Sequence, residues 1–219
     1  MRSLGISLAF ALFLVVLIPV AESGQKDGLA DRVAELEAQV AAMEEILQFV
    51  YVETEEINNL AGPHWIIEGV NVHVRSGSGT TDDGCRFVHP PCESLTGLGN
   101  VIVGYNEPSL RVQPERTGSH NLVLGELHSY SSFGGFVAGR FNTVSGPYAS
   151  VSGGVLNEAS GFESSVSGGS GNEASGSSSS VSGGSSNRAS GARSSVSGGR
   201  GREAPDRHNW AAGSLFEEN

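Results

Sequence analysis

The most regular pattern of apolar and polar positions lies in the second half of the chain. Val-Ser-Gly-Gly begins four times at intervals of fifteen residues, at Val151, Val166, Val181 and Val196. Asn-x-Ala-Ser-Gly recurs in the same register between these blocks, from Asn157, Asn172 and Asn187. A constant period of this length is typical of a solenoid, in which each repeat forms one coil and stacks on its neighbours.

Each repeat predicts two short strands joined by glycine corners. Ser-Val-Ser alternates polar and apolar residues, so its valine points inward from one strand, and the repeated alanine points inward from a second. Glycines turn the corners, where a positive φ is needed. The asparagines suit turn positions and are able to stack as a side-chain ladder. The expected core consists of Val137, Val151, Val166, Val181, Val196, Ala159, Ala174 and Ala189.

Degenerate copies extend the repeat region to residues 100–213. Phe136-Val137 and Val123-Leu124 precede the regular copies at steps of fourteen, Asn100–Gly104 is an earlier copy, and Trp210 begins the last. Aromatic residues gather in these end copies, as expected where a stack must be shielded. One coil buries too little apolar surface to offset the entropy of ordering it, so it needs stacking and packing against other chains.

A heptad pattern precedes the repeats and predicts a coiled-coil helix within residues 24–61. Val33, Val40 and Leu47 occupy positions a, while Leu36, Met43 and Val50 occupy positions d. Pro63, which follows Gly62, is expected to end the helix.

The segment Arg32-Val33-Ala34-Glu35-Leu36-Glu37 is similar to a short motif of parallel three-stranded coiled coils. In that motif, Arg32 reaches Glu37 of a neighbouring helix and covers the apolar seam. The predicted trimer contacts are therefore Arg32, Val33, Leu36, Glu37, Val40 and Met43. The competing interpretation is a dimer with an ordinary exposed ion pair.

The first 23 residues have the pattern of a signal peptide. Arg2 is followed by an apolar run from Ile6 to Val20 and by the small-x-small site Ala21-Glu22-Ser23. We expect a secreted or cell-surface protein without a transmembrane segment in the mature chain, with the periplasm as the alternative location. An uncleaved anchor is the competing interpretation of this segment.

Residues 62–99 predict a strand and a loop that join the helix to the repeats. Val70, Val72 and Val74 alternate with polar residues and predict a strand that caps the solenoid with its valines inward. Cys85 and Cys92 flank Pro90-Pro91, and in an oxidising compartment they predict a small loop disulfide. Metal binding is the alternative, but two cysteines and His89 fall short of four zinc ligands. This irregular loop is the expected binding element.

Composition argues against catalysis and nucleic-acid binding. The chain has 31 glycines and a formal net charge of −11, which repels phosphate backbones. It has no Gly-x-Ser-x-Gly elbow, phosphate-binding loop or metal-ligand spacing of histidines. We therefore expect a protein without enzymatic activity and without a cofactor.

The repeats resemble the left-handed parallel β-roll of YadA-type trimeric autotransporter adhesin heads, over Val137–Gly213 and more weakly over Asn100–Gly135. The layout is also similar to a group of uncharacterised secreted bacterial repeat proteins. The fourteen-residue repeat of those heads is one residue shorter, and there the head precedes the coiled coil, so we do not extend their membrane anchoring to this chain. The resemblance implies a mainly β, homotrimeric β-solenoid.

The expected function is adhesin-like attachment, with cell-surface proteins, matrix proteins or glycans as partners. The alternatives are an extracellular fibre or matrix subunit without a discrete ligand, and an ice-binding solenoid. Residues 214–219 are expected to form a short tail.

Overall fold

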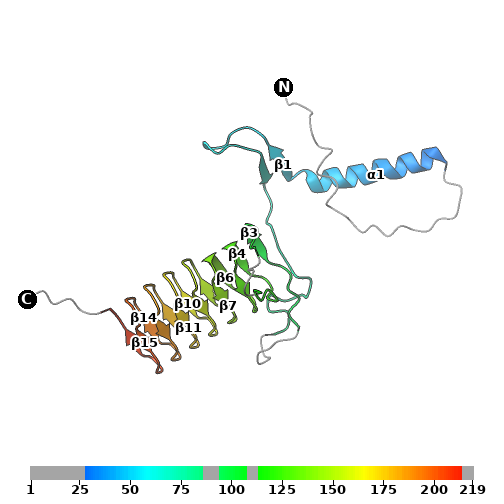
Figure 1. Cartoon of the computed structure of the whole chain (residues 1–219). Helices are drawn as coiled ribbons and strands as arrows, with labels where there is room; N and C mark the ends of the chain where they lie inside the picture. The colour runs from blue at the N-terminus through cyan, green and yellow to red at the C-terminus, as the bar shows by residue number, and fades with distance from the viewer. Residues whose placement is uncertain (1–27, 86–93, 108–112, 214–219) are drawn as a thin grey trace, which may run out of the picture. The chain divides into compact units, whose positions relative to one another are not determined.

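The computed structural model describes residues 28–85, 94–107 and 113–213. The predicted signal peptide, Cys92 and the C-terminal tail lie outside these ranges. The chain divides into two compact units, residues 1–71 and 72–219. The first contains the helix and a small hairpin, and the second contains a parallel β-solenoid (Figure 1).

The described part of the first unit, residues 28–71, contains one helix and one antiparallel hairpin. Helix α1 spans Leu29–Leu47, and strand β1 (Val50–Glu53) pairs with β2 (His64–Ile67). The predicted helix is therefore wrong beyond Leu47, where Val50 was placed at position d. The physical reason is the run Phe49-Val-Tyr-Val52, whose aromatic and β-branched side chains favour an extended strand, and which finds a partner in β2.

The second unit is built from two parallel sheets whose strands alternate along the chain. We name them the valine sheet and the alanine sheet after the inward residue of the regular coils. The valine sheet contains, in spatial order, β16 (Trp210–Ala211), β14 (Ser195–Val196), β12 (Ser180–Val181), β10 (Ser165–Val166), β8 (Ser150–Val151), β6 (Phe136–Arg140), β4 (Leu122–Glu126) and β3 (Val101–Val103).

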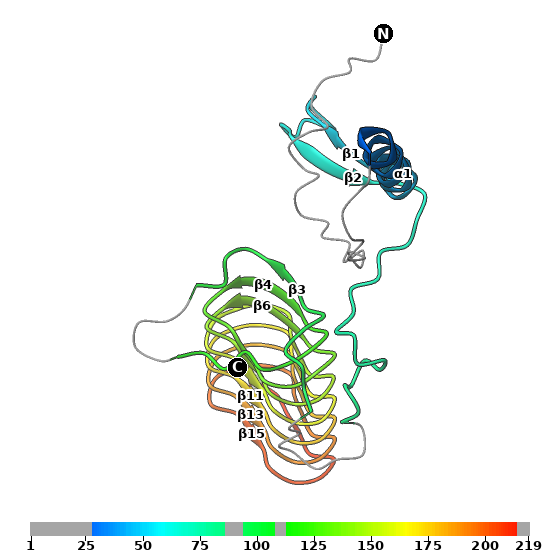
Figure 2. The ribbon, with the colours of Figure 1, turned by 90° about the vertical axis from the view of Figure 1, so that its right-hand side faces the viewer.

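The alanine sheet contains six strands that face the valine sheet across the interior. In spatial order they are β15 (Glu203–Ala204), β13 (Arg188–Ala189), β11 (Glu173–Ala174), β9 (Glu158–Ala159), β7 (Thr143–Val144) and β5 (Ser129–Tyr130). Every pair inside both sheets is parallel, and Val166 lies beside Val151 and Val181. Viewed along the stack, the coils superimpose (Figure 2). The sequence repeat is thus one coil of a solenoid, as predicted.

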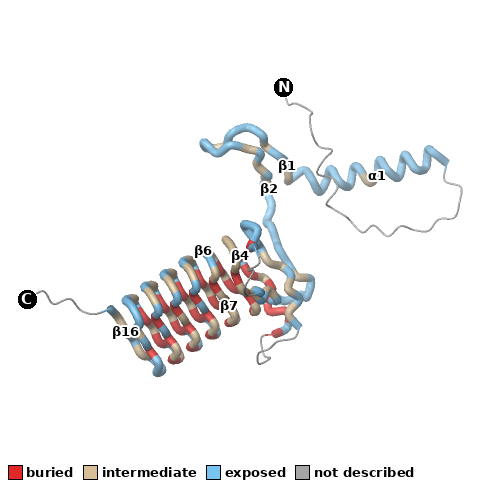
Figure 3. Tube along the Cα trace, viewed as in Figure 1, coloured by how far each residue is buried: buried red, intermediate tan, exposed pale blue. Residues whose placement is uncertain are grey.

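The core is a narrow column along the axis of the solenoid (Figure 3). All eight predicted core residues are fully buried, together with Val123, Val144 and Ala204. Such small inward side chains keep the two sheets close and leave the coil thin. Toward the N-terminal coils, Tyr130 takes the inward position of the alanine sheet, in register with Val144 and Ala159. In the same coils Phe133 packs edge-on against Tyr148 with ring centroids 5.1 Å apart.

A ladder of buried asparagines links successive coils. The backbone N–H of Asn172 donates to Oδ1 of Asn157, and the backbone N–H of Asn187 donates to Oδ1 of Asn172, both at 3.0 Å. Nδ2 of Asn172 donates to the carbonyls of Gly168 at 2.9 Å and Gly184 at 3.0 Å. The side chain thereby pairs the N–H of Asn187 and the carbonyl of Gly168, and it gives a second bond to the carbonyl of Gly184, which also accepts the backbone N–H of Ser170.

Two glycines of each coil have different roles. Gly169 and Gly184 take a positive φ of 84° at the corner, as the corner prediction requires. Gly161 and Gly176 do not, but a Cβ on either would collide with the backbone carbonyl of the next coil. The second position is therefore glycine because of close packing between coils, and not, as predicted, because of a positive φ.

The predicted capping strand at residues 70–75 is wrong. These residues form no strand, and the side chains of Val70, Val72 and Val74 are exposed. Alternation alone does not make a strand, because its backbone also needs a pairing partner. The first strand of the valine sheet is β3, which pairs with β4.

Candidate functional site

The helix presents an unburied apolar stripe within the first unit. None of its residues is buried, and Val33, Leu36, Val40, Met43 and Leu47 are all classed as exposed. The exposed fraction of Leu36 is 56% and that of Val40 is 50%. The predicted pair Arg32 and Glu37 is exposed on the same helix. In proteins most of the stability of a helix comes from packing of its apolar face, and in the described residues no side chain of this face is buried.

The outer face of the valine sheet carries two parallel rows of serines. One row is half-buried and the other exposed, and consecutive members lie one coil apart. Strand geometry sets about 4.8 Å between coils and about 6.6 Å between the rows. The rows are Ser150, Ser165, Ser180 and Ser195, and Ser152, Ser167, Ser182 and Ser197.

Apolar and aromatic residues border the serine rows at both ends. Phe136 precedes Ser150 in the first row, and Trp210 follows Ser195. Trp210 is largely exposed, and its Nε1 donates to Oγ of Ser197 at 2.8 Å. The outer face of the valine sheet therefore carries regularly spaced serine hydroxyls, with the aromatic rings of Phe136 and Trp210 at its two ends.

A buried carboxylate organises the loop of residues 76–83. Oδ1 of Asp83 accepts from Oγ of Ser76 at 2.7 Å, and Oδ2 accepts from both the backbone N–H and Oγ1 of Thr96 at 2.8 Å. Burial by itself would raise the pKa of Asp83. Hydrogen bonds from Ser119, Ser76, Ser78 and Thr96 outweigh burial and hold this pKa well below its usual range.

His120 connects this loop to the solenoid. Its Nε2 accepts the backbone N–H of Ser76 at 3.1 Å, which places the proton of the neutral ring on Nδ1. Nδ1 is buried and lies 3.9 Å from Oδ1 of Asp83. The imidazole and the carboxylate together fix the start and the end of the loop.

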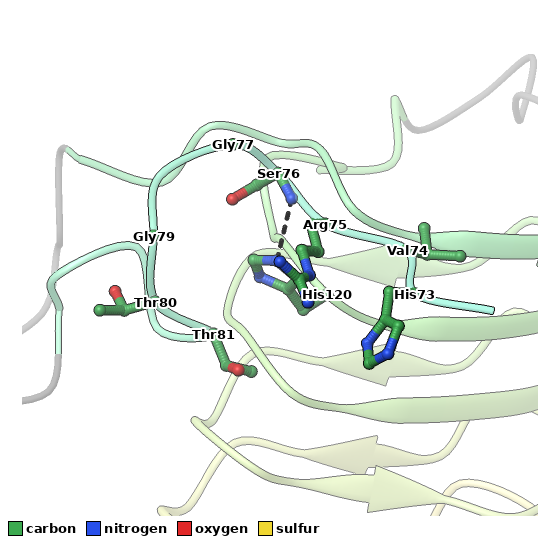
Figure 4. Close-up of a pocket in the computed structure, with 9 residues that line it drawn as sticks. All are labelled: His73, Val74, Arg75, Ser76, Gly77, Gly79, Thr80, Thr81 and His120. Carbon is green, nitrogen blue, oxygen red and sulfur yellow. Dashed lines mark hydrogen bonds between the residues drawn. The ribbon is translucent and has the colours of Figure 1, made fainter. Parts of the chain in front are cut away.

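A shallow pocket of about 400 Å³ opens beside this loop (Figure 4). It is lined by His73, Val74, Arg75, Ser76, Gly77, Gly79, Thr80, Thr81 and His120. Two of these residues, Thr80 and Thr81, belong to the irregular loop that was predicted as the binding element. The prediction missed His73, Arg75 and His120, because no local motif joins residues 73–75 to a histidine in the first solenoid coils.

Cys85 lies next to this loop and is buried and disulfide-bonded. Its predicted partner Cys92 lies outside the described residues. Sγ of Cys85 lies 3.3 Å from Oγ of Ser94, whose hydroxyl donates to the carbonyl of Asp83 at 3.1 Å. The cysteine therefore borders the segment that Asp83 organises.

Two searches of the described residues bear on membrane and metal binding. No helix in residues 28–85, 94–107 and 113–213 is both long and apolar enough to cross a bilayer. Within the same residues, no three His, Cys, Asp or Glu side chains are grouped so as to hold a metal ion.

Comparison with known proteins assigns no family. No protein family model matches the sequence, and no curated protein matches it significantly.

Proposed function

We propose that this chain is a secreted, non-enzymatic attachment protein that acts as a homotrimer. The observation that carries the proposal is the apolar stripe of α1, which follows a heptad and has no partner among the described residues of its own chain. A parallel coiled coil would bury Val33, Leu36, Val40 and Met43 against their counterparts. The Arg32 and Glu37 pair favours three chains over two.

The solenoid supports attachment because it is a stiff scaffold with repeated outer positions. Its coils are joined by two parallel sheets and the asparagine ladder, so the serine rows keep a constant geometry. Single contacts made by hydroxyls are weak. Three linked copies multiply them, since after the first chain has bound the others bind at high effective concentration. The partners are cell-surface proteins, matrix proteins or glycans.

The test compares trimeric and monomerised protein on coated surfaces. Leu36→Asp with Val40→Asp places charges at positions d and a, whereas Ala38→Asp changes an outward position of the same helix. We expect the wild type and A38D to be retained on surfaces coated with gelatin, heparin or cellulose, and the double variant to dissociate at least about tenfold faster. Equal retention of the double variant, or no retention of the trimer on any surface, contradicts the proposal.

Ice binding is a second candidate, favoured by the two serine rows alone. Their spacings form a regular hydroxyl lattice on a β-face of fixed geometry. Replacing Ser167 and Ser182 with Lys would break the exposed row without touching the core. Thermal hysteresis in the wild type that disappears in this variant supports ice binding, and its absence in the wild type rejects it.

The fibre alternative is disfavoured by the last coil. Arg200, Arg202, Glu203, Asp206 and Arg207 concentrate charge at this end of the solenoid. Charged residues on an edge oppose the addition of further strands from another molecule. Filaments visible by electron microscopy at micromolar concentration would reverse this ranking.

A further inference from the structure

We infer that the pocket beside the Asp83 loop binds an acidic sugar unit, a monosaccharide that carries a carboxylate or a sulfate group. The pocket lies wholly within the second unit and is lined by residues of a single chain. This inference goes beyond the proposed attachment function and does not depend on the trimer.

The charge of the lining points to an anion. The chain as a whole is acidic, yet the lining contains one arginine, two histidines and neither Asp nor Glu. Among the described residues, no carboxylate lies within ion-pair distance of Arg75, whereas Arg140 pairs with Glu126 and Arg188 pairs with Glu173. An unpaired guanidinium at the wall of a pocket offers two parallel donors to a carboxylate or sulfate.

The remaining polar groups of the pocket suit sugar hydroxyls. Oγ1 of Thr80 already accepts the backbone N–H of Gly84 at 3.0 Å, so its own proton remains available to donate. The hydroxyl of Thr81 and the ring of His73 line the same space in Figure 4. Hydroxyls and imidazoles both donate and accept, which matches the mixed hydrogen bonding of a sugar ring.

The carboxylate of Asp83, which organises the neighbouring loop, does not compete for Arg75. The side chain of Asp83 has no exposed surface and is not part of the lining. Its oxygens are already engaged by Ser76, Ser78 and Thr96. These bonds, with the bond from Ser76 to His120, fix one side of the pocket before a ligand arrives, which lowers the entropic cost of binding.

The size of the pocket limits the ligand. A volume of about 400 Å³ lies near the lower end of small-molecule sites, which range from about 300 to 1,000 Å³. Gly77 and Gly79 form one rim at positive φ, and a Cβ on either would meet no described atom within 4 Å. An open rim allows a longer acidic polysaccharide to continue past the pocket, while one unit occupies it.

The inference is tested by titration with single sugars, followed by NMR of the full mature chain. The probes are methyl glucuronide, glucose 6-sulfate and, as the neutral reference, methyl glucoside. We expect both acidic probes to shift resonances of residues 73–81, with affinity at least tenfold above that of the neutral sugar. Arg75→Gln should weaken acidic-probe binding by roughly 10- to 100-fold, the effect of losing a charged hydrogen bond.

A matched control variant distinguishes binding in the pocket from a general effect of the positive charge of the protein. Arg207→Gln removes the same charge from an exposed position of the last coil. It should leave binding unchanged. Equal affinity for neutral and acidic sugars, no binding of either, or equal weakening by R75Q and R207Q overturns the inference. The attachment proposal is judged separately by the retention of trimer and monomer on surfaces.

Discussion

Oδ1 of Asn157 accepts the backbone N–H of Asn172 from the next coil at 3.0 Å. The same bond joins Asn142 to Asn157 at 2.8 Å and Asn172 to Asn187 at 3.0 Å. Each asparagine is buried, and its amide bonds to buried backbone groups of its own coil and of the adjacent coils. The ladder therefore adds side-chain bonds between successive coils to the backbone bonds of the sheets.

Removing one member of the ladder should destabilise the solenoid. Asn172→Ala deletes the acceptor used by Asn187 and both donors of the Asn172 amide. Leaving buried backbone groups unpaired costs about 1–3 kcal/mol for each group, so we expect a loss of at least about 2 kcal/mol. Thermal unfolding followed by circular dichroism measures the loss. Ser167→Ala, an exposed change in the same coil, should leave the unfolding temperature nearly unchanged, and equal effects would contradict this role of the ladder.

Gly176, which is in close contact with the next coil, and Gly168, which is not, should respond differently to alanine. A Cβ at Gly176 would collide with the carbonyl oxygen of Gly191, whereas at Gly168 it would meet no described atom within 4 Å. We expect Gly176→Ala to cost about 3 kcal/mol or more because two backbones must separate. Gly168→Ala should be neutral or stabilise by up to about 1 kcal/mol, because it restricts the unfolded chain. Similar unfolding temperatures for the two variants would show that the coils are not closely packed at Gly176.

A histidine takes the place of an asparagine in the ladder and should make the fold sensitive to acid. Nδ1 of His128 accepts the backbone N–H of Asn142 at 3.2 Å, and Nε2 lies 3.1 Å from the carbonyl of Leu124. Burial lowers the pKa of His128 and outweighs the hydrogen bonds that favour the charged ring. The ring is therefore neutral in the folded chain at pH 7.

The sign of the pH effect follows from this lowered pKa. Below the ordinary histidine pKa of about 6.5, the unfolded chain takes up a proton that the folded chain resists, so stability falls as pH falls. The slope from one histidine is at most about 1.4 kcal/mol per pH unit. His128→Asn should remove this part of the acid sensitivity, and His208→Asn, at an exposed position, should not. Urea unfolding at about pH 7.5 and about pH 5 compares the variants, and identical pH dependence in all three proteins would contradict the prediction.

Sequence periodicity was enough to predict the solenoid because each repeat forms one coil in constant register. Val166 and Ala174 are in register with the valines and alanines of the neighbouring coils. Because each of these coils has fifteen residues, the inward positions recur at that interval in the sequence. The substitution of His128 in the ladder was missed, although it lies fourteen residues before Asn142, because a histidine does not match an asparagine motif. Its backbone position was predictable, but its side-chain role was not.

The predictions that were wrong concern segments of the chain that do not repeat. The end of α1 was placed too late because a heptad can continue through Val50 while its β-branched neighbours favour a strand. The pocket was missed because Arg75 and His120 are brought together by the hydrogen bond between Ser76 and His120, over 44 positions of sequence. This contact depends on the loop that Asp83 organises. Neither an arginine nor a histidine in the sequence is enough to predict it.

The central claim is that the exposed stripe of α1 joins three chains. Sedimentation equilibrium of residues 24–219, the chain without the predicted signal peptide, measures this directly. We expect the mass of three chains for the wild type, and of one folded chain for the variant with Leu36→Asp and Val40→Asp. A wild-type protein that sediments as a single chain at micromolar concentration would contradict the claim.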